Sequence, residues 1–208
     1  KDASSSFWDC GNVNYFGKHI MTTQNDETAL GQGSSVKMET QETMKIIAAG
    51  NIFTGTFERD GMGGILTLGR NFECRPNKLK GYYKYTSAKV SVSKGHLNEG
   101  EDDLCSLYIA LTDEQITVNT NKGIYFDPNS SAVIAYGSIS DEESKGADSF
   151  KEFTVDLEYK DLKRIPKYII VVASSSKYGD YMEGGKGSTM WLDDLELVYP
   201  KSMEEVRK

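Results

Sequence analysis

The sequence is poor in histidine, proline and long apolar runs, and each of these shortages disfavours a class of protein. With 2 His and 4 Pro among 208 residues, it indicates neither a histidine-rich metal centre nor a Pro-rich linker between domains. No run reaches the roughly 18 apolar residues of a membrane-spanning helix, so we expect no membrane span. The first residues, KDASSSFWDC, do not have the pattern of a signal peptide.

Positive charge is also in the minority. The chain has 24 Lys+Arg against 31 Asp+Glu, which gives a net charge of -7. Such a chain repels nucleic-acid phosphates and anionic membrane surfaces. We therefore expect no nucleic-acid partner.

Cysteine is scarce and odd in number. Cys10, Cys74 and Cys105 have no CxxC spacing, so the sequence predicts neither a disulfide framework nor a zinc site. Whether two of them form a single bridge stays open.

Short segments rich in β-branched and aromatic residues dominate the chain, and Gly, Asn and Asp separate them. In FTVDLEY, Phe153, Val155 and Leu157 alternate with polar residues, which is typical of a strand with one solvated face. YIIVVA is apolar at every position and predicts a central strand. METQETMKIIAAG fits a strand, a turn and a second strand better than a helix in this β-rich setting.

About nine such segments predict an all-β fold, specifically an antiparallel β-sandwich. No shift in composition divides the chain. We expect one domain over residues 1–208, with its core at about 7–199 and a polar tail at 200–208.

The Ser- and Gly-rich stretch ASSSKYGDYMEGGKGST suggests a phosphate loop or a nucleophile elbow, and both fail on spacing. GGKGST leads into a strand without the GxxxxGK[ST] pattern. The serines Ser174, Ser175 and Ser176 lack the G-x-S-x-G frame. His19 and His96, the two histidines, lie in polar segments, where a surface role is favoured over that of a catalytic base.

Carboxylic acids are the other candidates for chemistry, because glycoside hydrolysis requires a pair of them about 5 to 9.5 Å apart. The acids considered are Glu58, Asp60, Glu73, Asp180, Glu183, Asp193 and Asp194. From this set the catalytic candidates are Glu58, Glu73, Asp180 and Glu183. The sequence does not say which of them converge.

The segment WLDDLELVY places Asp193 on the same strand face as Leu195 and Leu197. A carboxylate on a core face requires neutralisation or hydrogen bonds. One interpretation is a structural Ca²⁺ ion bound by Asp193, with Asp194 as a weaker ligand. The other is a carboxylate that accepts hydrogen bonds from the backbone of the Gly-rich loop.

Aromatic side chains point to carbohydrate, because sugar C–H faces stack on Tyr or Trp while polar side chains bind the hydroxyls. RPNKLKGYYKY is the densest cluster; Tyr83 and Tyr85 share one strand face, so only one of its two faces is free for a ligand. The predicted ligand-binding residues are Tyr82, Tyr83, Lys84, Tyr85, Arg75, Tyr178, Asp180, Tyr181 and Trp8.

Taken in order, AAGNIFTGTF, RPNKLKGYYKY, AVIAYG, FKEFTVDLEY and ASSSKYGDYMEGGKGSTMWLDDLELVY resemble the "putative carbohydrate metabolism domain" family of exported and surface proteins of anaerobic gut bacteria. The resemblance runs from about Phe7 to Tyr199. It implies a jelly-roll sandwich similar to galactose-binding and other carbohydrate-binding modules, and export to the cell envelope behind a lipoprotein-type signal. The chain departs from the family at Met182, where the family often has an aromatic residue.

We therefore expect a non-catalytic glycan-binding or glycan-associated module at the outer-membrane surface or in the periplasm, with a poly- or oligosaccharide as its partner. A glycoside hydrolase that uses two carboxylates is the alternative. A structural module of a surface adhesin is a further one. No cofactor is expected apart from the Ca²⁺ ion considered at Asp193.

Overall fold

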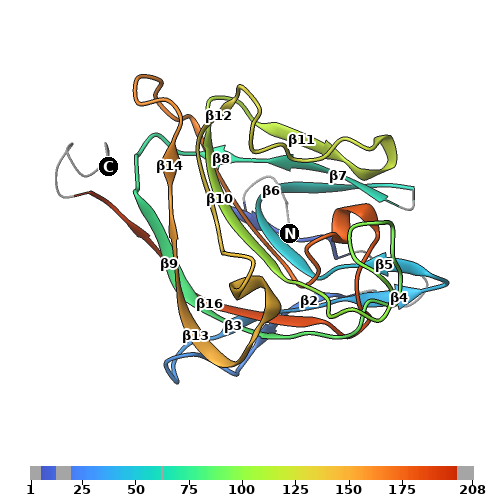
Figure 1. Ribbon diagram of the computed structural model, residues 1–208. Coiled ribbons are helices and arrows are strands. Elements are labelled where there is room, and N and C mark those ends of the chain that lie inside the picture. The colour runs from blue at the N-terminus through green and yellow to red at the C-terminus, as the bar shows by residue number, and fades with distance from the viewer. Residues whose placement is uncertain (1–5, 13–19, 62, 201–208) are drawn as a thin grey trace.

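Antiparallel strands form almost all of the regular structure (Figure 1). The structure is a computed structural model, which describes residues 6–12, 20–61 and 63–200. Within these residues there is no α-helix, and no helix is long and apolar enough to cross a membrane. His19 and the tail from residue 201 onward lie outside the described residues.

Two sheets pack face to face. The larger has the order β11-β7-β6-β15-β10-β12-β14, with β1 paired to β6 and β8 to β15. Its strands are β1 (Trp8–Asp9), β6 (Asn51–Asp60), β7 (Gly63–Leu68), β8 (Arg70–Asn71), β10 (Ser106–Thr112), β11 (Ile116–Asn119), β12 (Val133–Ser138), β14 (Glu158–Tyr159) and β15 (Tyr168–Ser174). The smaller sheet has the order β13-β9-β16-β3-β2. Its strands are β2 (Thr22–Asn25), β3 (Ser35–Glu39), β9 (Lys78–Thr86), β13 (Ala147–Asp156) and β16 (Thr189–Val198).

The remaining elements are short. The strands β4 (Gln41–Thr43) and β5 (Ile46–Ala48) form a separate hairpin. The segment METQETMKIIAAG is thus a strand, a turn and a strand, as predicted. The described residues also form the 3₁₀ turns η2 (Thr120–Lys122), η3 (Glu143–Lys145) and η4 (Gly179–Tyr181). The predicted antiparallel β-sandwich is confirmed.

The main core lies between the two sheets, and strand alternation builds it. The larger sheet contributes alternate residues such as Leu107, Ile109 and Leu111, which are fully buried. From the smaller sheet come Phe153 and Val155 of the FTVDLEY strand, as its alternation predicts. The two layers therefore bury their apolar faces against each other.

A second apolar cluster lies on the opposite face of the larger sheet. It contains Phe53, Leu66 and Ile170, and its neighbours include the aromatic residues Tyr108 and Phe126, whose rings stack with centroids 4.9 Å apart. The strand of YIIVVA, β15, is central, between β6 and β10, and contributes residues to both clusters. In Figure 1 the larger sheet turns from the steep β10 and β12 to the nearly horizontal β6, β7 and β11. This curvature shelters the second face of the sheet.

Two residues of β9 that were predicted to bind a ligand are buried. Tyr83 and Tyr85 belong to the main core with 0% and 2% of their surface exposed, so they are not available to a ligand. Burial raises the pKa of the Tyr83 phenol to about 12. Tyr82 and Lys84 lie on the outer face of the sheet, where Lys84 Nζ lies 4.4 Å from the centroid of the Trp191 ring.

The strand β16 contains a β-bulge, so its side chains do not alternate along its whole length as the sequence predicts. The register against β9 shifts between Asp193 and Glu196, and Asp194 has a φ of 46°. Because of this extra residue, Leu192 before the bulge and Leu195 after it both pack against the main core. Asp193 therefore does not share the core face of Leu195.

Candidate ligand-binding cleft

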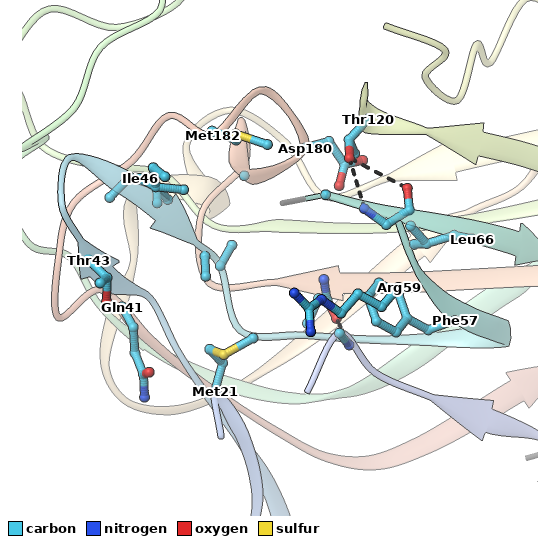
Figure 2. Close-up of a pocket in the computed structure, with 18 of the residues that line it drawn as sticks. Met21, Gln41, Thr43, Ile46, Phe57, Arg59, Leu66, Thr120, Asp180 and Met182 are labelled. Atoms are coloured by element: carbon cyan, nitrogen blue, oxygen red, sulfur yellow. Dashed lines mark hydrogen bonds between the residues drawn. The ribbon is translucent and has the colours of Figure 1, made fainter. Parts of the chain in front are cut away.

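A cavity of about 500 Å³ lies on the second face of the larger sheet, and we call it the cleft (Figure 2). One wall comes from β6 and β7, the other from the β4–β5 hairpin, and the loop that contains η4 closes one side. The lining residues used below are Met21, Met44, Ile46, Ile47, Ala49, Asn51, Phe57, Arg59, Gly64, Leu66, Thr120, Asp180 and Met182.

Alternation along β6 directs its side chains into the cleft. Asn51, Phe57 and Arg59 line it, and they lie at odd positions of NIFTGTFERD, as does the buried Phe53. Opposite them on β7, a Cβ atom at Gly64 would lie 2.2 Å from the Phe57 ring. The glycine therefore allows that ring to lie across β7.

Thr120 fixes the end of the same wall. Its Oγ1 accepts a hydrogen bond from Gly64 N at 3.2 Å and donates to Gly64 O at 3.5 Å, as the dashed lines in Figure 2 mark. The contact ties η2 to β7 and keeps a hydroxyl at the edge of the cleft.

Asp180 lies where the cleft meets a smaller cavity of about 50 Å³. Asn51 lines both spaces as well, and Tyr108 and Lys177 line the smaller one. Part of Asp180 is accessible to solvent, but many protein atoms lie around its carboxyl group. They keep water away from the carboxyl, and this desolvation raises its pKa. Among the described residues, no hydrogen bond or ion pair engages that carboxyl, so it is available to a ligand.

We expect Asp180→Asn to raise the melting temperature at pH 7 by about 2 °C. The folded-state pKa is raised above the unfolded value of about 3.9. The stabilising contribution of the carboxyl is therefore complete below that value and is lost as the pH rises through the folded-state pKa. The asparagine has no proton to lose, so the difference between variant and parent should grow from pH 3.5 to pH 7 in thermal melts.

The matched control is Asp148→Asn, which removes a carboxylate that is exposed on β13. Its melting temperature should follow that of the parent at both pH values. Equal behaviour of the two variants would argue against a desolvated Asp180.

An aromatic cluster stands beside η4. The rings of Tyr125 and Tyr181 stack with centroids 4.0 Å apart, and His96 packs against Tyr181 at 4.3 Å and Tyr178 at 4.4 Å. Tyr178 and Tyr181 were predicted as ligand-binding residues. The structure places them against His96 and Tyr125, and neither lines the cleft among the described residues.

Glu183 is a structural residue rather than a free acid. Its fully buried carboxylate accepts hydrogen bonds from the backbone N–H groups of Lys94 (2.7 Å), His96 (3.2 Å) and Leu97 (2.5 Å), and lies 3.1 Å from His96 Nδ1. Burial alone would raise the pKa of this carboxyl, but these hydrogen bonds, from Leu97 first, outweigh it and lower the pKa. The buried and fully engaged Glu183 therefore does not fit the prediction of a catalytic acid.

Asp103 anchors the Ser- and Gly-rich loop, although it was not among the predicted site residues. Its buried Oδ2 accepts hydrogen bonds from Ser176 Oγ (2.6 Å), Ser188 Oγ (2.8 Å) and Gly185 N (2.8 Å). Its Oδ1 accepts one from Leu104 N at 2.8 Å. Burial raises the pKa of this carboxyl, against the effect of those bonds. The serines of the loop therefore have a structural role, in agreement with the absence of the G-x-S-x-G pattern of a nucleophile elbow.

The remaining predicted residues are dispersed. Glu58 and Glu73 are exposed and do not line the cleft. Arg75 donates to the carbonyl of Arg164 and lies over the ring of Tyr159, and Trp8 packs against the main core. Of the predicted site residues, only Asp180 lies in the cleft.

The carboxylate of Asp193 accepts hydrogen bonds from Ala29 N at 2.8 Å and Asp194 N at 3.0 Å. The interpretation as a backbone-bonded carboxylate fits this geometry, although its donors lie outside the Gly-rich loop. The described residues contain no group of three His, Cys, Asp or Glu side chains suited to a metal ion. All three cysteines are free thiols.

The fold and the cleft define an antiparallel β-sandwich with a ligand-sized cavity in the second face of one sheet. The family model of the "putative carbohydrate metabolism domain" matches residues 1–198. The chain belongs to this family and is a carbohydrate-related domain. No curated protein matches the sequence.

Two of the solved structures that are similar to the chain are described as "putative glycoside hydrolases". One is described as a "putative glycoside hydrolase" from Bacteroides thetaiotaomicron, with 25% identity, a TM-score of 0.73, and coverage of 94% of this chain and 63% of that one. The other, with the same description, is from Bacteroides vulgatus, with 24% identity, a TM-score of 0.68, and coverage of 86% and 77%. The chain thus spans less than two thirds of the length of the first.

Proposed function

We propose that the protein is a non-catalytic glycan-binding module and that the cleft is its binding site. The observation that carries this proposal is the meeting of an aromatic ring, Phe57, with the polar side chains of Asn51, Thr120 and Asp180 around a cavity of about 500 Å³. A sugar presents both a C–H face for such a ring and hydroxyls for such polar groups. Family membership supports a carbohydrate as the ligand.

The acid content of the cleft favours binding over hydrolysis. Both common mechanisms of glycoside hydrolysis use two carboxyl groups. Asp180 is the one carboxylic acid among the described residues that line the cleft. The resemblance to exported proteins supports a location at the cell envelope, where the module would capture polysaccharide.

Phe57→Ala is expected to weaken glycan binding at least tenfold, because the sugar would lose its stacking surface. The measurement is affinity electrophoresis and titration calorimetry against plant and host polysaccharides. Tyr82→Ala is the control, since Tyr82 lies on the outer face of the other sheet. Loss of binding in Tyr82→Ala with retention in Phe57→Ala would move the site to that outer face.

Glycoside hydrolysis is a second candidate, and the raised pKa of Asp180 favours it, because a general acid must hold a proton near neutral pH. The description of the Bacteroides thetaiotaomicron structure supports the same interpretation. Release of reducing sugar from the same polysaccharides, abolished by Asp180→Asn, would establish it. Binding without release would leave the module non-catalytic.

A further inference from the structure

The lining of the cleft is divided into two chemically different parts. Asn51, Arg59, Thr120 and Asp180 lie on the side of β6, β7 and η4. Figure 2 places Met21 and Ile46 away from Thr120, and draws Met182, the C-cap of η4, between Ile46 and Asp180. The apolar part consists of Met21, Met44, Ile46, Ile47, Ala49 and Met182. Two polar residues of β4, Gln41 and Thr43, also line the hairpin side, and the side-chain amide of Gln41 donates to Ile20 O at 3.1 Å.

A bare sugar ring matches only the polar part. Each hydroxyl that is buried without a hydrogen-bond partner destabilises the complex. The side chains of the apolar part offer methyl, methylene and thioether groups, none of which is a strong partner for a hydroxyl. The occupant of this part is therefore expected to be apolar.

Methionine side chains at the rim of the same part suit an apolar ligand. Met44 and Lys45, at the tip of the hairpin, have φ values of 50° and 63°, and Met182 has a φ of 58°. Met44 and Lys45 are the central residues of the two-residue turn between the paired Thr43 and Ile46, a turn that favours positive φ at both positions, and Met182 is the left-handed C-cap of η4. Met44 is also 84% exposed. Flexible methionine side chains adapt to apolar groups of varied shape.

On the basis of the proposed function, we infer that the cleft binds a glycan whose sugar carries an apolar substituent, such as an O-acyl ester. The sugar ring lies against Phe57, with its hydroxyls toward Asn51 and Asp180. The substituent packs against Ile46 and the methionines. Each buried methyl or methylene group should strengthen binding about fourfold.

The test uses matched pairs of oligosaccharides. Those prepared from acetylated xylan, glucomannan and pectin are compared by calorimetry with the same material after mild alkaline de-esterification. We expect the acetylated member of a pair to bind at least fourfold more tightly. Ile46→Asn should reduce this ratio to about one.

The control variant is Ile165→Asn, which makes the same change at an exposed position outside the cleft lining and should keep the parent ratio. The readout is a ratio of two affinities for one protein, so partial unfolding of a variant does not alter it. Equal binding of the acetylated and de-esterified members overturns the inference alone. Absence of binding to every member of the panel overturns the proposed function as well.

Discussion

Asp103→Ala is expected to reduce the free energy of unfolding by about 4 kcal/mol. The carboxylate is fully buried and accepts four hydrogen bonds, so its removal leaves the hydroxyls of Ser176 and Ser188 and the N–H groups of Gly185 and Leu104 without their acceptor. Each such group costs about 1–3 kcal/mol when it stays buried and unsatisfied, and partial rearrangement limits the sum. Urea denaturation followed by circular dichroism measures the loss.

The chain offers a matched control in the preceding residue. Asp102 is exposed and its carboxylate lies 2.8 Å from Lys89 Nζ, in a surface ion pair. Such pairs contribute about 0–1 kcal/mol, so Asp102→Ala should change the stability by less than about 1 kcal/mol. Similar losses in the two variants would contradict the assignment of Asp103 as the anchor of the loop.

These two neighbouring aspartates also mark a limit of prediction from sequence. The segment NEGEDD suggests a solvated loop, and that interpretation is right for Asp102 and wrong for Asp103. What buries Asp103 is the loop of Ser176, Gly185 and Ser188, which lies more than 70 positions further along the chain. A local charge pattern carries no information about such a distant partner.

Strand patterns are more informative, because alternation is a local property. FTVDLEY correctly predicts Phe153, Val155 and Leu157 as buried, and the uniformly apolar YIIVVA correctly predicts a central strand. The bulge at Asp194 interrupts alternation in WLDDLELVY. The sequence does not indicate which of the two adjacent aspartates, Asp193 or Asp194, adopts a positive φ.

The cleft could be predicted only in part. Asn51, Phe57 and Arg59 share one face of a single strand, so alternation along NIFTGTFERD is enough to group them. Their meeting with Met21, Thr120 and the β4–β5 hairpin depends on tertiary packing. The sequence identifies Asp180 as a polar candidate, but that it lines the same cleft as Phe57 depends on tertiary packing as well.

Tyr83→Ala is the second substitution with a large expected effect, a loss of about 4 kcal/mol in the free energy of unfolding. Tyr83 is fully buried, packs edge to face with Phe153 at a centroid distance of 6.0 Å, and donates from Oη to Glu143 O at 3.0 Å. Removal of the ring leaves a cavity in the main core that the rigid strands on either side cannot close. Tyr83→Phe loses the hydroxyl alone and should cost about 1 kcal/mol.

Tyr82→Ala supplies the comparison, because Tyr82 is the adjacent residue of the same strand and its side chain lies on the outer face. It should cost less than about 1 kcal/mol, since it opens no internal cavity. A mild effect of Tyr83→Ala, close to that of Tyr82→Ala, would contradict the burial of Tyr83 and restore it as a ligand-binding residue. If Tyr83→Ala is much less stable than Tyr82→Ala, a loss of glycan binding in Tyr83→Ala results from unfolding. Substitutions of the cleft residues are then the ones that test glycan recognition.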